Sequence, residues 1–154
     1  MPVKISGVRK LNKDLSKILP NARSRFAKEM KRTIVDIIVE KIVSGLSPVK
    51  GFGRFKKYSD SYEKIKGRSA PVDLVKSGDM LENMRARQTN KGAIVIEFTD
   101  ATQRKKAEGH NRGNRKKNLP KRRILPTGTN ETFKTDILNK IVKIVEKAIG
   151  AAIK

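Results

Sequence analysis

The 154-residue chain has no cysteine, no tryptophan and a single histidine, His110. The absence of cysteine excludes disulfide scaffolds, thiolate metal sites and thiol catalysis. The longest purely apolar runs span only a few residues, so the sequence predicts no membrane-spanning helix, and the first ten residues lack the apolar core of a signal peptide. With 36% hydrophobic residues, a chain of this length favours one soluble domain made in a cytoplasm, with a modest core.

Acidic residues are scarce, since 37 Lys and Arg stand against 15 Asp and Glu and give a formal net charge of +22. Residues 59–103 carry seven bases and seven acids, whereas residues 104–123 hold ten bases and one acid. This second stretch is rich in Gly and Asn, and we predict that it is a loop. Its bases form the candidate surface for an acidic partner or DNA: Arg104, Lys105, Lys106, Arg112, Arg115, Lys116, Lys117, Lys121, Arg122 and Arg123.

Two interpretations of this basic stretch stay open. Clustered Lys and Arg release counterions when they neutralise phosphates, which favours contact with nucleic acid or with an acidic protein. Alternatively, the stretch is a solvated segment whose charge keeps the chain soluble. It contains no aromatic residue, so it lacks the stacking platform of single-strand nucleic-acid binders.

Two segments carry apolar residues at helical spacing. The first runs from Asn21, a candidate N-cap, to Leu46, and the second begins near Thr129 or Asn130. Each has two adjacent apolar rows, a stripe wider than one packing contact needs, so we expect one row to face a second subunit. The candidates for that interface are Val35, Val39, Val43, Val142, Val145 and Ile149.

A hairpin is the clearest β-sheet signal. Residues 85–89 and 93–99 have strand composition and flank an Asn-Lys-Gly turn at 90–92, while short helical turns are predicted at 60–66 and after Gly78. The expected fold is α+β, with two long amphipathic helices packed on a small antiparallel sheet and long loops. Because Leu19-Pro20 marks a boundary, we divide the chain into a basic N-terminal arm (1–20) and a single domain (21–154).

The inventory of reactive side chains argues against an enzyme. His110 lies outside any strand-to-helix GxSxG elbow, so a serine triad is not expected. A metal site would have to be built on Asp100, Glu108, His110 and Asn111, and one histidine among arginines is more typical of a polar surface residue than of a metal ligand. Gly51-Phe52-Gly53 is a lone GxG without the strand and helix that a phosphate loop needs. We therefore expect no catalytic residue, no cofactor and no bound metal.

The order of segments along the chain resembles that of bacteriophage tail-completion or neck proteins, the small proteins that join a filled head to its tail. The resemblance covers most of the chain from about Asn21 onward, beginning with the first long helix. The further segments that carry it are SPV (47–49), YSDSY (58–62), VDLVKSGDML (72–81), KAEGHNRG (106–113) and NLPKRRILP (118–126).

Three short motifs of that family have counterparts here in the family's order. The Leu-x-x-(Ser/Thr)-Gly-x-(Met/Leu) step corresponds to residues 74–80, the His-x-x-Gly motif to residues 110–113, and the Pro-x-Arg turn to residues 120–122. The resemblance implies a structural protein without catalytic activity. It further implies a homo-oligomeric ring at the head-to-tail junction, in contact with portal or adaptor proteins and with tail proteins.

In this interpretation the protein is part of the virion and is assembled in the bacterial host cytoplasm, with double-stranded DNA as a further contact and no membrane. A ring uses two different patches head to tail, which agrees with the wide apolar stripes of both helices. The alternative is a basic nucleic-acid-binding protein of ribosomal or nucleoid type, which explains the charge of +22 directly. A small nuclease that depends on His110 is a third alternative.

Overall fold

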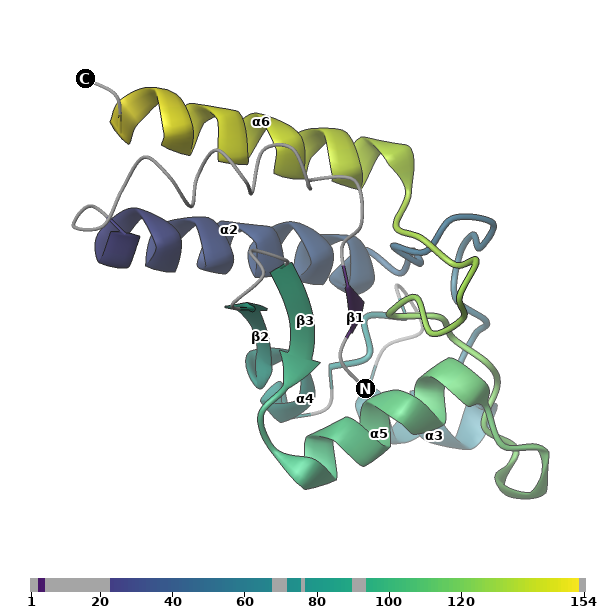
Figure 1. The fold of residues 1–154 in the computed structure, drawn as a ribbon. Coiled ribbons are helices and arrows are strands. Elements are labelled where there is room, and N and C mark those ends of the chain that lie inside the picture. Colours follow the sequence, from purple (N-terminus) through teal and green to yellow (C-terminus); the bar gives the residue numbers. More distant parts are fainter. Residues whose placement is uncertain (1–2, 5–22, 68–71, 76, 90–93, 153–154) are drawn as a thin grey trace.

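A computed structural model describes residues 3–4, 23–67, 72–75, 77–89 and 94–152. Within these residues the chain folds as an α+β domain, which confirms the predicted class. Helices α2 (Arg23–Val43) and α6 (Thr135–Ala152) lie side by side and antiparallel, and α2 also packs on the small sheet (Figure 1). Helix α5 (Ala101–Arg112) contacts the opposite end of the sheet and the short helix α4 (Asp79–Glu82).

Helix α2 forms because its apolar residues recur every four positions. Met30, Ile34, Ile38 and Ile42 are all buried along one side of the helix and face the common core. The helix ends at Val43, and Gly45 follows with φ +80°. Left-handed backbone of this kind favours glycine and ends helices, as the sequence predicted at this position.

Helix α6 begins at Thr135, five residues later than the nearer of its two predicted caps. The preceding residues are held by the segment that follows α2: Phe133 pairs with Val49 in an isolated antiparallel bridge, and the Lys134 N–H donates to the Pro48 carbonyl at 2.9 Å. These backbone bonds fix residues 132–134 in extended form, so the helix cannot start earlier. From Thr135 onward, Ile137, Ile141 and Val145 are buried against the core.

The sheet has the strand order β1–β3–β2 and is antiparallel throughout. Strands β2 (Met84–Gln88) and β3 (Ile94–Phe98) match the predicted hairpin strands to within a residue, and the predicted turn at 90–92 lies outside the described residues. The register pairs Met84 with Phe98, and both side chains are buried. Strand β1 (Val3–Lys4) adds two residues of the predicted N-terminal arm to the free edge of β3; residues 5–20 of that arm lie outside the described residues.

The prediction that residues 104–123 form a loop is wrong, because residues 101–112 form helix α5. Asp100 caps this helix by accepting the Gln103 N–H at 2.8 Å, and Gly113 ends it. The segment after it contains a 3-10 turn, η1 (Arg115–Lys117), closed by a bridge between Asn114 and Leu119. The predicted short helices are confirmed as α3 (Asp60–Lys66) and α4.

Candidate interaction site

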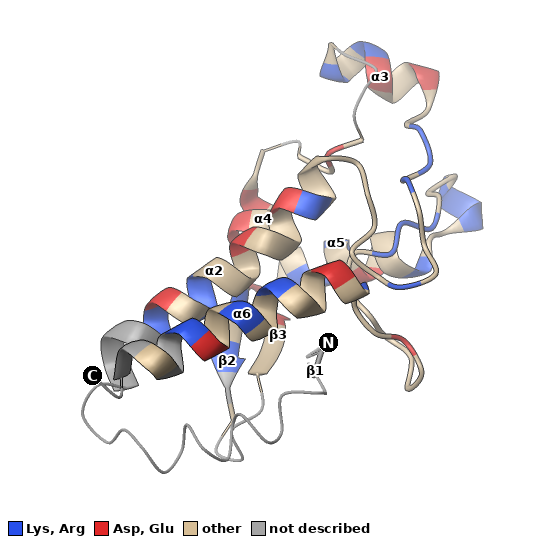
Figure 2. Cartoon of the chain, turned by 90° about the horizontal axis from the view of Figure 1, so that it is seen from above, with Lys and Arg blue, Asp and Glu red and all other residues tan. Residues whose placement is uncertain are grey.

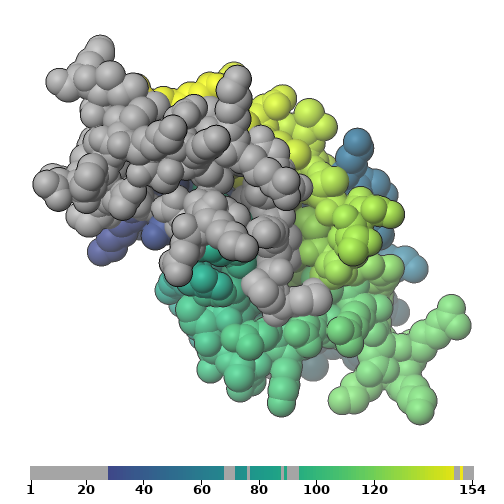
Figure 3. Space-filling model, viewed as in Figure 1, coloured from purple at the N-terminus to yellow at the C-terminus, as the bar shows by residue number. Residues whose placement is uncertain are grey.

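Most of the ten candidate basic residues form an exposed surface around α5 and η1. Arg104, Lys105, Lys106 and Arg112 project from α5, and η1 consists of three exposed bases. The segment that holds η1 projects from the lower right of the molecule (Figure 1 and Figure 3), and η1 itself is drawn in blue in Figure 2. With Lys121, eight of the ten side chains are exposed. We call this set the basic surface.

Arg122 does not belong to the basic surface, because its side chain is only 3% exposed. Its Nε and Nη2 donate to the carbonyls of Lys56 and Lys57, each at 3.0 Å, and its guanidinium lies 5.0 Å from the centre of the Tyr58 ring. Burial lowers the pKa of Arg122, which the nearby tyrosines partly oppose. The prediction that Arg122 lies on an exposed loop is therefore wrong.

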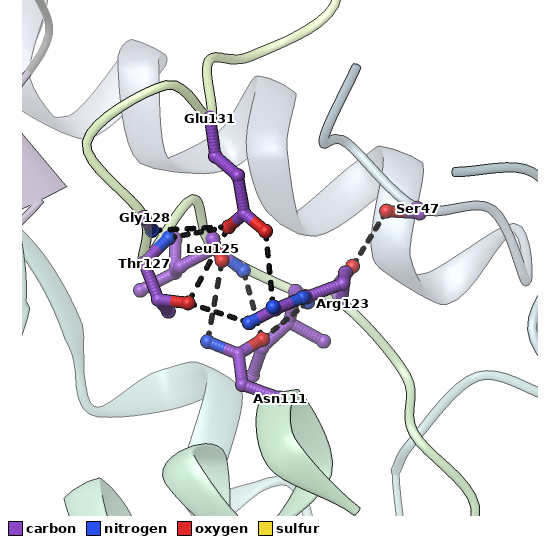
Figure 4. A network of polar contacts seen from close by, with 8 residues as sticks. Ser47, Asn111, Arg123, Leu125, Thr127, Gly128 and Glu131 are labelled. Atoms are coloured by element: carbon purple, nitrogen blue, oxygen red, sulfur yellow. Dashed lines mark hydrogen bonds and ion pairs between the residues drawn. The ribbon is translucent and has the colours of Figure 1, made fainter. Parts of the chain in front are cut away.

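Arg123 is also engaged within the protomer. Its guanidinium pairs with the Glu131 carboxylate at 3.0 Å and donates to the Thr127 hydroxyl, and its carbonyl accepts the Ser47 hydroxyl at 2.6 Å (Figure 4). The Thr127 N–H leads the hydrogen bonds that lower the pKa of Glu131. Arg123 thus fastens residues 123–131 to the segment that follows α2, and its prediction as a partner contact is not supported by this geometry.

Asn111, which the sequence suggested only as a member of the unfavoured metal cluster, holds the same segment to α5. Its side-chain oxygen accepts the N–H groups of Ile124 and Leu125 at 2.7 and 3.2 Å, and its amide donates to the Leu125 carbonyl at 3.2 Å (Figure 4). The side chain is 2% exposed. A signal was present in the sequence, because Asn111 lies four residues after the buried Ala107 and therefore on the same side of a helix.

A cavity of about 390 Å³ opens where three distant segments meet. All three motifs that carry the phage resemblance contribute to its wall: Leu74, Gly78 and Met80 from the first, His110 from the second, and Pro120 with Arg122 from the third. We call this cavity the motif pocket. Ser77 of the first motif also lines it, and its other lining residues are Tyr58, Ser59, Tyr62, Lys106, Lys117, Asn118 and Leu119.

One wall of the motif pocket is fixed by a buried ion pair. Asp73, 4% exposed, pairs with Lys66 and accepts the Val75 N–H at 3.0 Å, while the Tyr58 hydroxyl accepts the Leu74 N–H at 2.9 Å. Burial opposes the charge of Lys66, but hydrogen bonds to Asp73 and Tyr58 outweigh it and raise the pKa of Lys66. These bonds hold Leu74 at φ +56°, a conformation that costs a non-glycine residue free energy.

His110 lies at the base of the motif pocket with its Nδ1 buried and without a hydrogen-bond partner among the described residues. Burial, with a smaller contribution from the positive charge of Arg122, lowers the pKa of His110 to about 4. The imidazole is therefore neutral at pH 7. Its backbone carbonyl accepts the Arg122 N–H at 2.7 Å, which ties the second motif to the third.

The candidate interface valines have different environments. Val145 is fully buried in the core, so its prediction as an interface residue is wrong. Val35, Val39 and Val142 are half-buried, and Val43 is 37% exposed. The side chain of Ile149 lies outside the described residues.

Two of these valines line a groove of about 640 Å³ between α2, α4 and strand β2. Val35, Val39 and Ala86 are its half-buried apolar residues, and β2 is an edge strand of the sheet in the described residues. We call it the edge groove. Its rim carries the charged residues Lys28, Lys31, Arg32, Asp36, Glu82 and Arg85.

Comparison with protein-family models, with curated proteins and with solved structures found no match. Within the described residues, no three Asp, Glu or His side chains gather as ligands for a metal ion. The described helices include none that combines the length and the apolar character needed to cross a bilayer.

Proposed function

We propose that this protein is a structural component of a tailed bacteriophage virion that forms a homo-oligomeric ring at the head-to-tail junction. The observation that carries the proposal is the meeting of the three family-like motifs in one pocket, although about 40 residues of sequence lie between the first and the third. Motifs that only shape local turns need not lie together in the fold, whereas these three line the same pocket.

The edge groove supports the subunit contact that a ring requires. Half-buried Val35 and Val39 lie beside a strand whose outer backbone groups have no strand partner in the described residues. An apolar strip next to a free strand edge is a common basis for association between protein chains. In a ring each protomer would present this groove to a different patch of its neighbour.

In this proposal α2 and α6 form the rigid body of each protomer, as two long amphipathic helices, and the extended loop segments make the contacts above and below the ring. Those contacts would be with portal or adaptor proteins on the head side and with tail proteins on the other, in a virion assembled in the host cytoplasm. The protein would act without catalysis, by shape and charge.

The basic surface favours a second candidate, a nucleic-acid-binding protein. Eight exposed bases around α5 and η1 could neutralise phosphates and release their counterions. Such a protein would be monomeric, and its affinity for DNA would fall steeply as salt rises.

Light scattering of the purified 17.3-kDa chain at low and high salt, with and without double-stranded DNA, separates the two candidates. A ring that forms without DNA supports the junction role, as does a monomer that assembles only when a partner ring is added. A monomer that binds DNA and releases it steeply with salt would overturn that role in favour of the second candidate. A monomer that does not bind DNA and does not assemble even when a partner ring is added would overturn both candidates.

A further inference from the structure

We propose that the motif pocket is a docking site for an acidic segment of a partner protein that also inserts an apolar side chain. The inference deepens the proposed function, on which it rests for taking the partner to be a neighbouring protein in the assembly. It concerns a cavity that is complete within one protomer, so it can be tested on the isolated chain.

The charge of the pocket wall favours an anionic guest. Lys106, Lys117 and Arg122 contribute three cations, and no Asp or Glu of the described residues lines the cavity. Arg122 uses Nε and Nη2 on backbone carbonyls, and among the described residues its Nη1 has no hydrogen-bond partner, so its hydrogens remain for a ligand. The attraction between a carboxylate and a poorly solvated guanidinium is stronger than the same attraction in water.

Part of the remaining wall is apolar, and the cavity is small. Leu74, Met80, Leu119 and Pro120 line it, and a volume of about 390 Å³ is near the lower end of the ~300–1,000 Å³ range of ligand pockets. A cavity of this size takes one or two side chains of a peptide. Apolar lining next to cations thus selects a segment in which acidic and apolar residues are neighbours.

The aromatic residues of the pocket argue against a nucleic-acid base as the guest. The Tyr58 ring already has the Lys66 ammonium 4.9 Å and the Arg122 guanidinium 5.0 Å from its centre, and it packs against Tyr62 at 4.8 Å in a tilted arrangement. Single-strand binders instead present open aromatic faces on which successive bases stack. The geometry therefore favours a peptide over an oligonucleotide.

His110 supplies a built-in reporter of occupancy, because it is the only histidine in the chain and lines the same pocket. A bound carboxylate would favour the imidazolium and raise its pKa. Its imidazole proton resonances in an NMR titration therefore report binding next to His110, without overlap from any other histidine.

The test is the affinity of the full chain for a labelled eight-residue peptide of alternating Glu and Leu, measured by fluorescence anisotropy and by the His110 resonance. We expect binding that weakens by about tenfold, or ~1.4 kcal/mol, in Lys117→Glu and in Lys106→Glu. Lys116→Glu and Lys105→Glu make the same charge change next to these positions but outside the pocket wall, and we expect them to bind within about twofold of the parent chain.

Any of the following results would overturn the inference. The first is no binding up to about 1 mM peptide, and the second is equal weakening by all four lysine variants, which would mean general attraction to a basic chain. The third is equal binding of a peptide with Ser in place of Leu, or stronger binding of a single-stranded oligonucleotide of the same charge. Light scattering of the same samples keeps the two proposals apart, since a ring without peptide binding contradicts only the pocket.

Discussion

Arg122 is a cation held in the interior of the protein without a carboxylate partner among the described residues. Two backbone carbonyls and the Tyr58 ring take the place of water around its guanidinium. A buried charge without such partners would cost several kcal/mol. The arrangement joins residues 56–58 to the third motif, so the same side chain shapes the motif pocket and holds two loops together.

At the residue scale, His110 makes the stability of the fold depend on pH. Its pKa is about 4 in the folded chain and 6.5 in the unfolded one, so the unfolded state binds more protons between these values. The contribution of the neutral imidazole to the free energy of unfolding is complete above pH 6.5. It is lost as the pH falls towards 4, which lowers the free energy of unfolding by roughly 3 kcal/mol at most.

Replacing His110 with Gln removes this titration while keeping a neutral side chain of similar size. We therefore expect the difference in unfolding free energy between H110Q and the parent chain to shift in favour of the variant between pH 7 and pH 4. Urea denaturation at several pH values measures this difference. The effect of titrating carboxylates cancels in the difference because both chains contain the same carboxylates. A difference that does not change with pH would contradict the burial of a neutral imidazole.

At the element scale, α5 shows how a helix of very polar composition is held in place by its ends and two contact points. Asp100 caps its start, Ala107 and Asn111 are buried in its middle and last turns, and Gly113 ends it. Gly113 has φ +70°, and a Cβ there would lie 2.8 Å from the Lys121 backbone nitrogen. The chain therefore needs glycine at this turn both for its backbone angle and for space.

We expect Gly113→Ala to destabilise the fold by about 2 kcal/mol or more, because it adds strain at a positive φ and a clash with backbone atoms. The matched control is Gly109→Ala, one turn earlier in α5, where the added Cβ would make an ordinary 3.6 Å contact with Leu119. That change should stabilise the fold by ~0.5–1 kcal/mol, because alanine favours a helix interior over glycine. Thermal or urea unfolding compares the two, and equal effects of the same sign would contradict the described turn.

At the scale of the whole molecule, the basic surface and the edge groove lie on different elements. The basic surface lies around α5 and η1, while the edge groove lies between α2, α4 and β2. A protein with a net charge of +22 repels its own copies, so a ring requires apolar contact strong enough to overcome that repulsion. The edge groove is the described surface best suited to supply it.

Val39→Glu places a charge in the edge groove and should convert the assembly to monomers. Ile65→Glu makes a comparable change on α3, at a side chain that is 75% exposed, and should leave the assembly unchanged. Arg32→Glu, at the exposed rim of the groove, covers the case in which Val39→Glu fails to fold. Light scattering with circular dichroism as a check of folding measures all three, and a ring that survives both groove variants would exclude this interface.

The elements that the sequence predicted well are those whose local pattern agrees with their final packing. Helix α2 repeats its apolar residues every four positions and is followed by Gly45, and the strand composition of β2 and of the β-branched β3 is local as well. Helix α5 was missed because Ala107 is its only buried apolar residue, which leaves no periodic signal. The start of α6 was misplaced because the bridge between Phe133 and Val49 links residues 84 positions apart.

The sequence by itself determined the α+β class, the principal helices and strands, the excess of positive charge, and the absence of cysteine chemistry. Only the tertiary structure decided which charges face solvent: it placed Arg122 inside, tied Arg123 to Glu131 and left eight bases exposed. It also decided that three separate motifs share one pocket and that Val145 belongs to the core. The physical reason is that composition and periodicity report what each residue prefers locally, whereas burial and partnership depend on which distant segment packs against it.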